Sequence, residues 1–169
     1  NASPPEVGRW PPIVAALASE KSHVAFMAVK TLVNGWATSH RYHEPNLLPC
    51  LFGCLAPAHD SLVHYICCHR LWDIIADVCG PVPCDCALRV APATDIKRQL
   101  KVLAVAFQAY HHVRFGGSSF AASNANYGRA IREVVALCAA EYGIARSMAP
   151  QHVSEIYVVP GTPPATQQG

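Results

Sequence analysis

Charged residues are scarce in this chain: Asp, Glu, Lys and Arg together make up 14% of its 169 residues. A disordered chain combines few hydrophobic residues with a high net charge, whereas this one has 51% hydrophobic residues and a formal net charge of +2. That net charge, taken alone, is too small to indicate a protein that binds nucleic acid. Length and composition therefore predict one packed domain with tails.

Recognisable catalytic motifs and long apolar runs are also absent. The sequence contains no GxxxxGK[ST] loop, no GxSxG elbow and no HExxH pair, which argues against the chemistry that those motifs carry. His111 and His112 beside Arg114 are better explained by the favourable place of cations near a helix end than by general-base catalysis. No apolar run is long enough to cross a bilayer. We expect a soluble, non-catalytic protein without membrane contact.

The first residues, NASPPEVGRWPP, are polar and rich in proline, and they do not resemble a secretion signal. Eight cysteines mixed with nine histidines, including the adjacent Cys67 and Cys68, suit metal binding in a reducing compartment better than a disulfide framework. We therefore expect an intracellular protein, nuclear or cytoplasmic.

Hydrophobic periodicity predicts a mainly α fold of about four helices. We expect a linker over 1–12, one helical domain over 13–150 and a disordered tail over 151–169. The predicted helices lie within 13–33 with a break near Ser19 or Ser22, from an Asp60 cap to Cys79, from a Thr94 cap to Gly116, and from Ser123 onward. The side chains expected to face the core are Val24, Met27, Ala28, Thr31 and Leu32, widened by Phe26, Val29 and Val33; Val63, Cys67, Leu71, Ile74 and Val78; Ile96, Leu100, Leu103, Phe107 and Tyr110; and Tyr127, Ile131, Val134 and Cys138.

Two pairs of metal-ligating residues stand close together in the middle of the chain. Cys50 and Cys54 flank Gly53, which permits a tight turn, and His64 and Cys68 are spaced i, i+4 on a predicted helix. Structural zinc takes four nitrogen or sulfur ligands, usually supplied as two close pairs. The spacing therefore predicts a structural Zn²⁺ site over 50–68, with all four positions filled by protein.

Several alternatives for the cysteines stay open. Cys67 can replace Cys68 as the fourth ligand, since it stands i, i+3 from His64, and His59 and His69 are spare ligands. The whole set can also be buried free thiols, because cysteine is among the most buried residue types. Cys79, Cys84 and Cys86 form a second cluster, best explained as ordinary loop and helix-end cysteines because no fourth ligand stands nearby.

The segment KTLVNGWATSHRYH, just before the cysteine turn, interleaves cations with aromatic rings. Cations hold phosphates and aromatic faces stack bases, so Lys30, Arg41 and His43 are candidate contacts to nucleic acid. The alternative is that Trp36 packs into the core and Arg41 is a solvated surface charge.

The run from Lys30 to Trp72 resembles the region downstream of the polymerase domain in non-LTR retrotransposon reverse transcriptases. In that family a W-x-T-x-x-R segment leads into a Cys/Cys–His/Cys zinc knuckle, with an acidic residue before "HY" and "LW" after the last cysteine. The matching residues are Trp36, Thr38 and Arg41, then Cys50, Cys54, Asp60, Leu62, His64, Tyr65, Cys68, Leu71 and Trp72. The segment AYHHVRF is similar to the helix that follows such knuckles. Two departures are the Cys-x3-Cys gap and the extra Cys67.

The resemblance implies a reverse transcriptase tail that holds RNA or target DNA for a polymerase elsewhere in the same polyprotein. For individual residues the resemblance implies structural zinc on Cys50, Cys54, His64 and Cys68, and it places Arg41 in the matched segment. Lys30, Arg41, His43 and Arg70 are the candidate nucleic-acid contacts. The polymerase carboxylates themselves are not present in this sequence. Two other classes remain: a zinc-stabilised protein-interaction domain and, more weakly, a Cys/His hydrolase.

Overall fold

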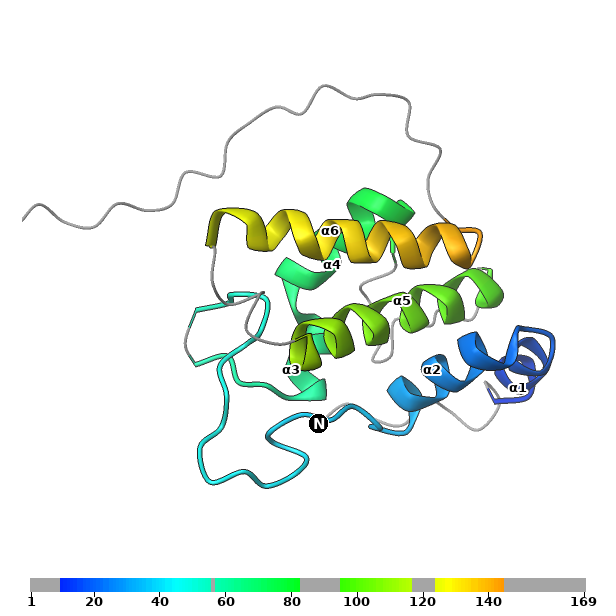
Figure 1. Cartoon of the computed structure of the whole chain (residues 1–169). Coiled ribbons are helices and arrows are strands. Elements are labelled where there is room, and N and C mark those ends of the chain that lie inside the picture. The colour runs from blue at the N-terminus through cyan, green and yellow to red at the C-terminus, as the bar shows by residue number, and fades with distance from the viewer. Residues whose placement is uncertain (1–9, 56, 83–94, 117–123, 145–169) are drawn as a thin grey trace, which may run out of the picture.

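The computed structural model describes residues 10–55, 57–82, 95–116 and 124–144. These residues form a mainly α fold, as predicted from the sequence, and Figure 1 shows the helices as a bundle with a long loop at one end. The helices are α1 (Trp10–Ala18), α2 (Ser22–Leu32), α3 (Leu62–Cys67), α4 (His69–Cys79), α5 (Ile96–Phe115) and α6 (Asn124–Glu141). Within the described ranges none of these helices is long and apolar enough to span a membrane.

The described chain has six helices: the predicted break near Ser19 or Ser22 separates α1 from α2, and an interruption that was not predicted separates α3 from α4. Between α1 and α2, Lys21 adopts extended backbone angles (φ −58°, ψ 137°), and the Ser19 hydroxyl donates a 2.8 Å hydrogen bond to the Ala16 carbonyl. Cys68 interrupts the predicted 61–79 helix with φ −67° and ψ 101°, so α3 ends at Cys67 and α4 begins at His69. These breaks set the directions of the short helices that surround the core.

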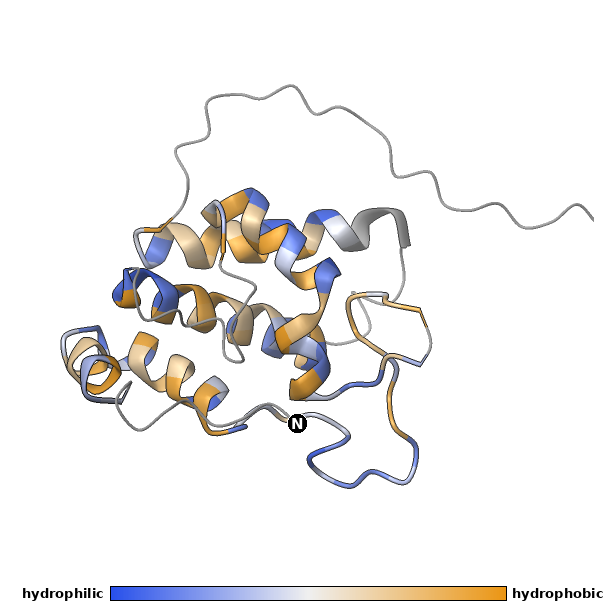
Figure 2. Ribbon diagram, turned by 180° about the vertical axis from the view of Figure 1, so that it is seen from behind, coloured by the Kyte–Doolittle hydropathy of each residue, from blue (hydrophilic) through white to orange (hydrophobic). Residues whose placement is uncertain are grey.

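Helix α5 lies at the centre of the bundle. It packs against α1, α2, α4 and α6, and Figure 1 shows it between α2 and α6. Its middle section is buried all round, including Leu100, Leu103 and Tyr110 of the predicted stripe. In Figure 2 this section is largely coloured as hydrophobic, whereas the loop that projects from the bundle is mainly hydrophilic in its outer part. A helix that is apolar on every side needs neighbours on every side.

Two predicted core faces are wrong in part. On α2, Val24 and Ala28 are buried, but Phe26 and the C-cap residue Val33 are 59% and 65% exposed and do not widen the buried stripe. Helix α2 packs mainly against α5, so hydrophobic side chains away from that face meet solvent. In the region of α3 and α4, Val63 and Cys67 are exposed, while Leu71, Trp72, Ile75 and Cys79 are buried. The break at Cys68 rotates α4 relative to α3, and the stripe does not continue across it.

The element ends also differ from prediction in places. Helix α1 begins at Trp10, inside the predicted 1–12 linker. The N-cap of α5 is Asp95, whose side chain accepts the Arg98 amide, and Thr94 lies outside the described residues. The predicted Ser123 cap and the tail over 151–169 also lie outside them. On α6, Ile131 and Cys138 are buried as predicted and Val134 is partly buried, while the side chain of Tyr127 lies outside what the structure describes.

Candidate metal centre

The first two cysteines lie on a turn held in place by backbone hydrogen bonds. The Gly53 amide donates to the Cys50 carbonyl at 3.1 Å, and the Cys50 amide donates to the Ala58 carbonyl at 3.0 Å. Gly53 has φ +81°, a left-handed conformation that a residue with a Cβ rarely adopts. An isolated antiparallel bridge between Pro49 and His59 closes the segment behind the turn. Cys50 and Cys54 are thereby presented on the same side.

The other two residues come from α3 and its junction with α4. Ser61 caps α3, since its hydroxyl accepts the His64 amide at 3.2 Å, and this corrects the predicted Asp60 cap. His64 therefore lies on the first turns of α3, while Cys68 is the non-helical residue before α4. The predicted helix does not continue past Cys68, but His64 and Cys68, four residues apart, still bring their ligand atoms within 4.8 Å of each other. The kink at Cys68 redirects the chain after that residue and so sets the direction of α4.

The side chains of Cys50, Cys54, His64 and Cys68 form one compact group. Their ligand atoms all lie within 4.8 Å of one another. The Cys68 sulfur is 3.8 Å from that of Cys50 and 3.5 Å from that of Cys54. Tetrahedral zinc with Zn–S bonds of about 2.3 Å places its sulfurs about 3.8 Å apart, close to both distances. All three are free thiols rather than disulfide partners.

The histidine in the group has an unused nitrogen. The Nε2 atom of His64 is buried and makes no hydrogen bond with the part of the chain that the structure describes. Leaving a buried polar atom without a partner costs about 1–3 kcal/mol, so such atoms mark places where a ligand or ion belongs. Three sulfurs and an imidazole nitrogen form a donor set typical of zinc. The residues present therefore fit a tetrahedral metal ion.

Backbone amides around the group favour thiolates. The Phe52 amide approaches the Cys50 sulfur at 3.4 Å, and the amides of Arg70 and Leu71, in the first turn of α4, hydrogen-bond the sulfurs of Cys54 and Cys68. A hydrogen bond from the Cys68 thiol lowers the pKa of Cys50 to about 4. Burial raises the pKa of Cys54, and the pKa of Cys68 is raised mainly by that hydrogen bond to Cys50 and also by burial. One thiolate thus forms readily, and a divalent cation would draw the protons from the other two.

The alternative ligands do not join the group. Cys67 is exposed, and His59 and His69 are exposed as well. Cys79 is buried elsewhere, with its pKa raised by burial to about 11, as expected for an inert thiol. Cys84 and Cys86 lie outside the described residues.

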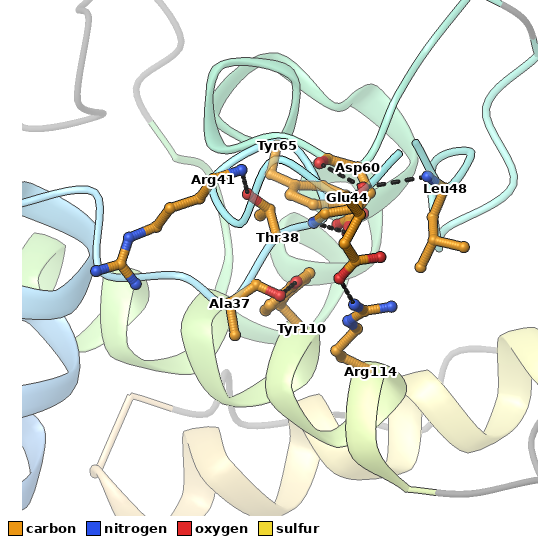
Figure 3. A network of polar contacts seen from close by, with 10 residues as sticks. Ala37, Thr38, Arg41, Glu44, Leu48, Asp60, Tyr65, Tyr110 and Arg114 are labelled. Atoms are coloured by element: carbon orange, nitrogen blue, oxygen red, sulfur yellow. Dashed lines mark hydrogen bonds and ion pairs between the residues drawn. The ribbon is translucent and has the colours of Figure 1, made fainter. Parts of the chain in front are cut away.

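A buried carboxylate lies beside the metal group, and its position was not foreseen from the sequence. Asp60 is 0% exposed. Its Oδ2 accepts the Ser39 amide at 2.7 Å, and its Oδ1 accepts the Tyr65 hydroxyl at 2.8 Å (Figure 3). Ser39 and Asp60 are 21 residues apart, so no local pattern pairs them. This carboxylate joins the segment before the cysteine turn to α3.

The residues predicted to contact nucleic acid lie on α2, in the loop between α2 and α3, and on α4. The Lys30 amino group lies 5.0 Å from the Phe26 ring, and the Arg41 guanidinium lies 5.6 Å from the Tyr42 ring. Arg41 is exposed and points away from the polar network in Figure 3. His43 is exposed, with φ +53°, and Arg70 is exposed at the start of α4.

Trp36 and the cations Arg114 and Lys101 are not available for contacts to nucleic acid. Trp36 is 1% exposed, which confirms the core interpretation. Arg114 and Lys101 pair with Glu44 and Glu20, at 2.7 and 3.8 Å.

The close grouping of three thiols and an imidazole is thus the main chemical feature of the described chain. Comparison with protein-family models, with curated proteins and with solved structures finds no match, so the site is interpreted from its own residues and geometry.

Proposed function

We propose that Cys50, Cys54, His64 and Cys68 bind one structural Zn²⁺. The observation that carries the proposal is the convergence of four ligand atoms within 4.8 Å. Four protein ligands fill a tetrahedral site and leave no position for a reactive water, so the ion contributes to folding and not to catalysis. The same grouping weakens the hydrolase alternative, because His64 is a member of the metal group rather than the partner of an isolated thiol.

Zinc uptake tests this proposal and separates the two adjacent cysteines. We expect about one zinc per chain for the wild type and for Cys67→Ser, measured by elemental analysis after gel filtration, as for a closed four-ligand site. We expect Cys68→Ser to lose most of the bound metal, because it removes a ligand. Cys67 is a matched control since it is the exposed neighbour of Cys68. Equal zinc content in both variants would contradict the assignment.

We further propose that the zinc-stabilised module contacts RNA or DNA as part of a non-LTR retrotransposon reverse transcriptase polyprotein whose polymerase residues lie elsewhere. The resemblance over Lys30–Trp72 supports the family. The exposure of His40, Arg41, Tyr42 and His43 supports the contact, because four consecutive side chains offer cations and an aromatic face to solvent. Arg70 adds a cation beside the zinc turn.

Arg41 is the residue with which to test nucleic-acid binding. Among the described residues its guanidinium forms no ion pair, so it is available to a phosphate. We expect Arg41→Ala to weaken binding across sequences and to flatten the slope of log affinity against log salt by about one unit. Fluorescence anisotropy with single-stranded and duplex RNA and DNA at several salt concentrations measures both effects.

Arg132→Ala is the matched control for Arg41→Ala. Arg132 is an exposed arginine on α6 that pairs with Asp77, and we expect its loss to change neither affinity nor slope. Absence of wild-type binding at low salt, or an Arg41→Ala slope equal to that of the wild type, would reject this contact. One observation then favours a protein-interaction domain instead: the exposed side chains of Phe26 on α2 and of its C-cap residue Val33.

A further inference from the structure

The segment 40–47 is a loop whose two ends are fastened to each other. At its base the Leu48 amide donates to the Ser39 hydroxyl oxygen at 3.1 Å, and the Asp60 amide donates to the Leu48 carbonyl at 2.8 Å. The His40 amide donates to the Asp60 carbonyl at 3.3 Å. Compact loops with fastened ends are commonly functional. Ser39, Leu48 and Asp60 therefore define the base that holds the exposed 40–43 side chains in place.

Asp60 can close this base only if its buried charge is satisfied. The Ser39 amide and the Tyr65 hydroxyl supply hydrogen bonds to its two carboxylate oxygens (Figure 3). Burying a carboxylate without hydrogen-bond donors is costly. If one donor is removed, the carboxylate oxygen that it served is left without a partner unless water reaches it. Loss of the Tyr65 hydroxyl therefore favours opening of the loop base.

The same hydroxyl also contacts the cysteine turn. The Tyr65 oxygen accepts the Leu51 amide at 3.3 Å, and Leu51 directly follows the ligand Cys50. Tyr65 itself directly follows the ligand His64, and its ring is fully buried. The Tyr65 hydroxyl donates to Oδ1 of Asp60 at 2.8 Å. One oxygen atom thus joins the metal turn to the loop base.

We propose that Tyr65 is a positioning residue that makes the order of the 40–47 loop depend on metal binding. The inference rests on the proposed zinc site and on the loop as the nucleic-acid contact, and it assigns their coupling to one hydroxyl. With metal bound, Cys50 and His64 are fixed, so the Leu51 amide and the Tyr65 hydroxyl stay in register with Asp60. Without metal the turn is released and Asp60 loses a donor. The loop therefore holds Arg41 and His43 in a fixed arrangement only when the ion is bound.

Trypsin cleavage after Arg41 measures opening of the loop without any nucleic acid. Cleavage of a transiently open segment follows the population of its open form. The experiment compares the full-length wild type, Tyr65→Phe and Tyr142→Phe, each with saturating zinc and with a chelator. Tyr142→Phe is the matched control because it removes a tyrosine hydroxyl that contacts Met27 instead. Cleavage after Arg132 in α6 and far-UV circular dichroism report the integrity of the bundle.

We expect zinc to protect Arg41 strongly in the wild type and in Tyr142→Phe. In Tyr65→Phe at saturating zinc we expect cleavage after Arg41 to rise roughly tenfold, the effect of one buried hydrogen bond lost, with Arg132 cleavage unchanged. If Tyr65→Phe lowers helix content, Asp60→Asn replaces it, because it weakens the same link and keeps the tyrosine. Asp73→Asn, at an exposed position of α4, is its control.

The outcomes separate the two proposals. A chain that takes up no zinc refutes the proposed metal site. A chain that takes up zinc but binds no RNA or DNA refutes only the proposed contact, because the cleavage measurement does not depend on it. Zinc protection of Arg41 that is equal in Tyr65→Phe and Tyr142→Phe, or absent in every variant, overturns the coupling.

Discussion

Replacing Cys54 by serine is expected to destabilise the protein far more than replacing Cys138 by serine. A structural zinc site contributes on the order of 10 kcal/mol in small domains, and the loss of one ligand removes much of it. Exchange of the buried Cys138 thiol for a hydroxyl should cost about 1–3 kcal/mol. Urea unfolding followed by circular dichroism, with zinc present, gives both free energies of unfolding.

This comparison discriminates because burial alone predicts the opposite order. Cys138 is 8% exposed and packs in α6, whereas Cys54 is only partly buried, on a loop. If ordinary packing governs both sites, Cys138→Ser is the more harmful change. Added chelator should lower the stability of the wild type to that of Cys54→Ser and leave Cys54→Ser unaffected. Equal stability losses in the two variants would contradict a folding role for the metal.

The grouping of Cys50, Cys54, His64 and Cys68 could be predicted because metal chemistry restricts the candidate residues strongly. Few residue types bind zinc, and two close pairs of them stand in Cys50–Cys68. The local geometry could not be predicted in the same way. The periodicity indicated one helix through Cys68, but the chain kinks there, and the Cys68 sulfur lies 3.8 Å from that of Cys50 and 3.5 Å from that of Cys54. The four residues do lie together, as predicted, although the predicted continuous helix is wrong.

The helices themselves could be predicted for a different reason. The spacing of apolar residues along the sequence indicates which face of a helix packs against a neighbour. The stripe Leu100, Leu103 and Tyr110 on α5 is buried as expected. The number of faces covered depends on tertiary packing, which the spacing does not contain. Phe26 and Val33 on α2 therefore look like core positions in the sequence and are exposed in the structure.

Long-range polar contacts were the least predictable part. The Tyr110 hydroxyl donates to the Ala37 carbonyl at 2.8 Å across 73 residues, and Arg114 pairs with Glu44 across 70 (Figure 3). Each contact fixes the segment between α2 and α3 to α5. No sequence motif at these four residues predicts which residues pair with each other. Asp60 is similar: next to Ser61 it reads as a helix cap, and the Ser39 amide and Tyr65 hydroxyl place it in the interior instead.

The Trp36 side chain contacts three helices at once. Its ring stacks on Tyr65 of α3 and Tyr110 of α5, with ring centroids 5.5 and 4.7 Å apart. Its indole nitrogen donates to the Thr31 hydroxyl oxygen of α2 at 2.9 Å. A buried indole that contacts three helices contributes both apolar area and a satisfied polar group. Trp36 also lies three residues before Ser39, which forms part of the base of the 40–47 loop.

We expect Trp36→Ala to lower the free energy of unfolding by about 3–5 kcal/mol, because it leaves a large cavity among Tyr65, Tyr110 and Phe107. Thermal and urea unfolding of the zinc-loaded protein measure the loss. Trp10→Ala is the control, since Trp10 is 37% exposed on α1 and should cost far less. If Trp36 served instead as an exposed base-stacking platform, the variant would keep its stability and lose about 1–3 kcal/mol of nucleic-acid affinity. The 1% exposure of Trp36 predicts the first result, and a stable Trp36→Ala protein with weakened binding would refute it.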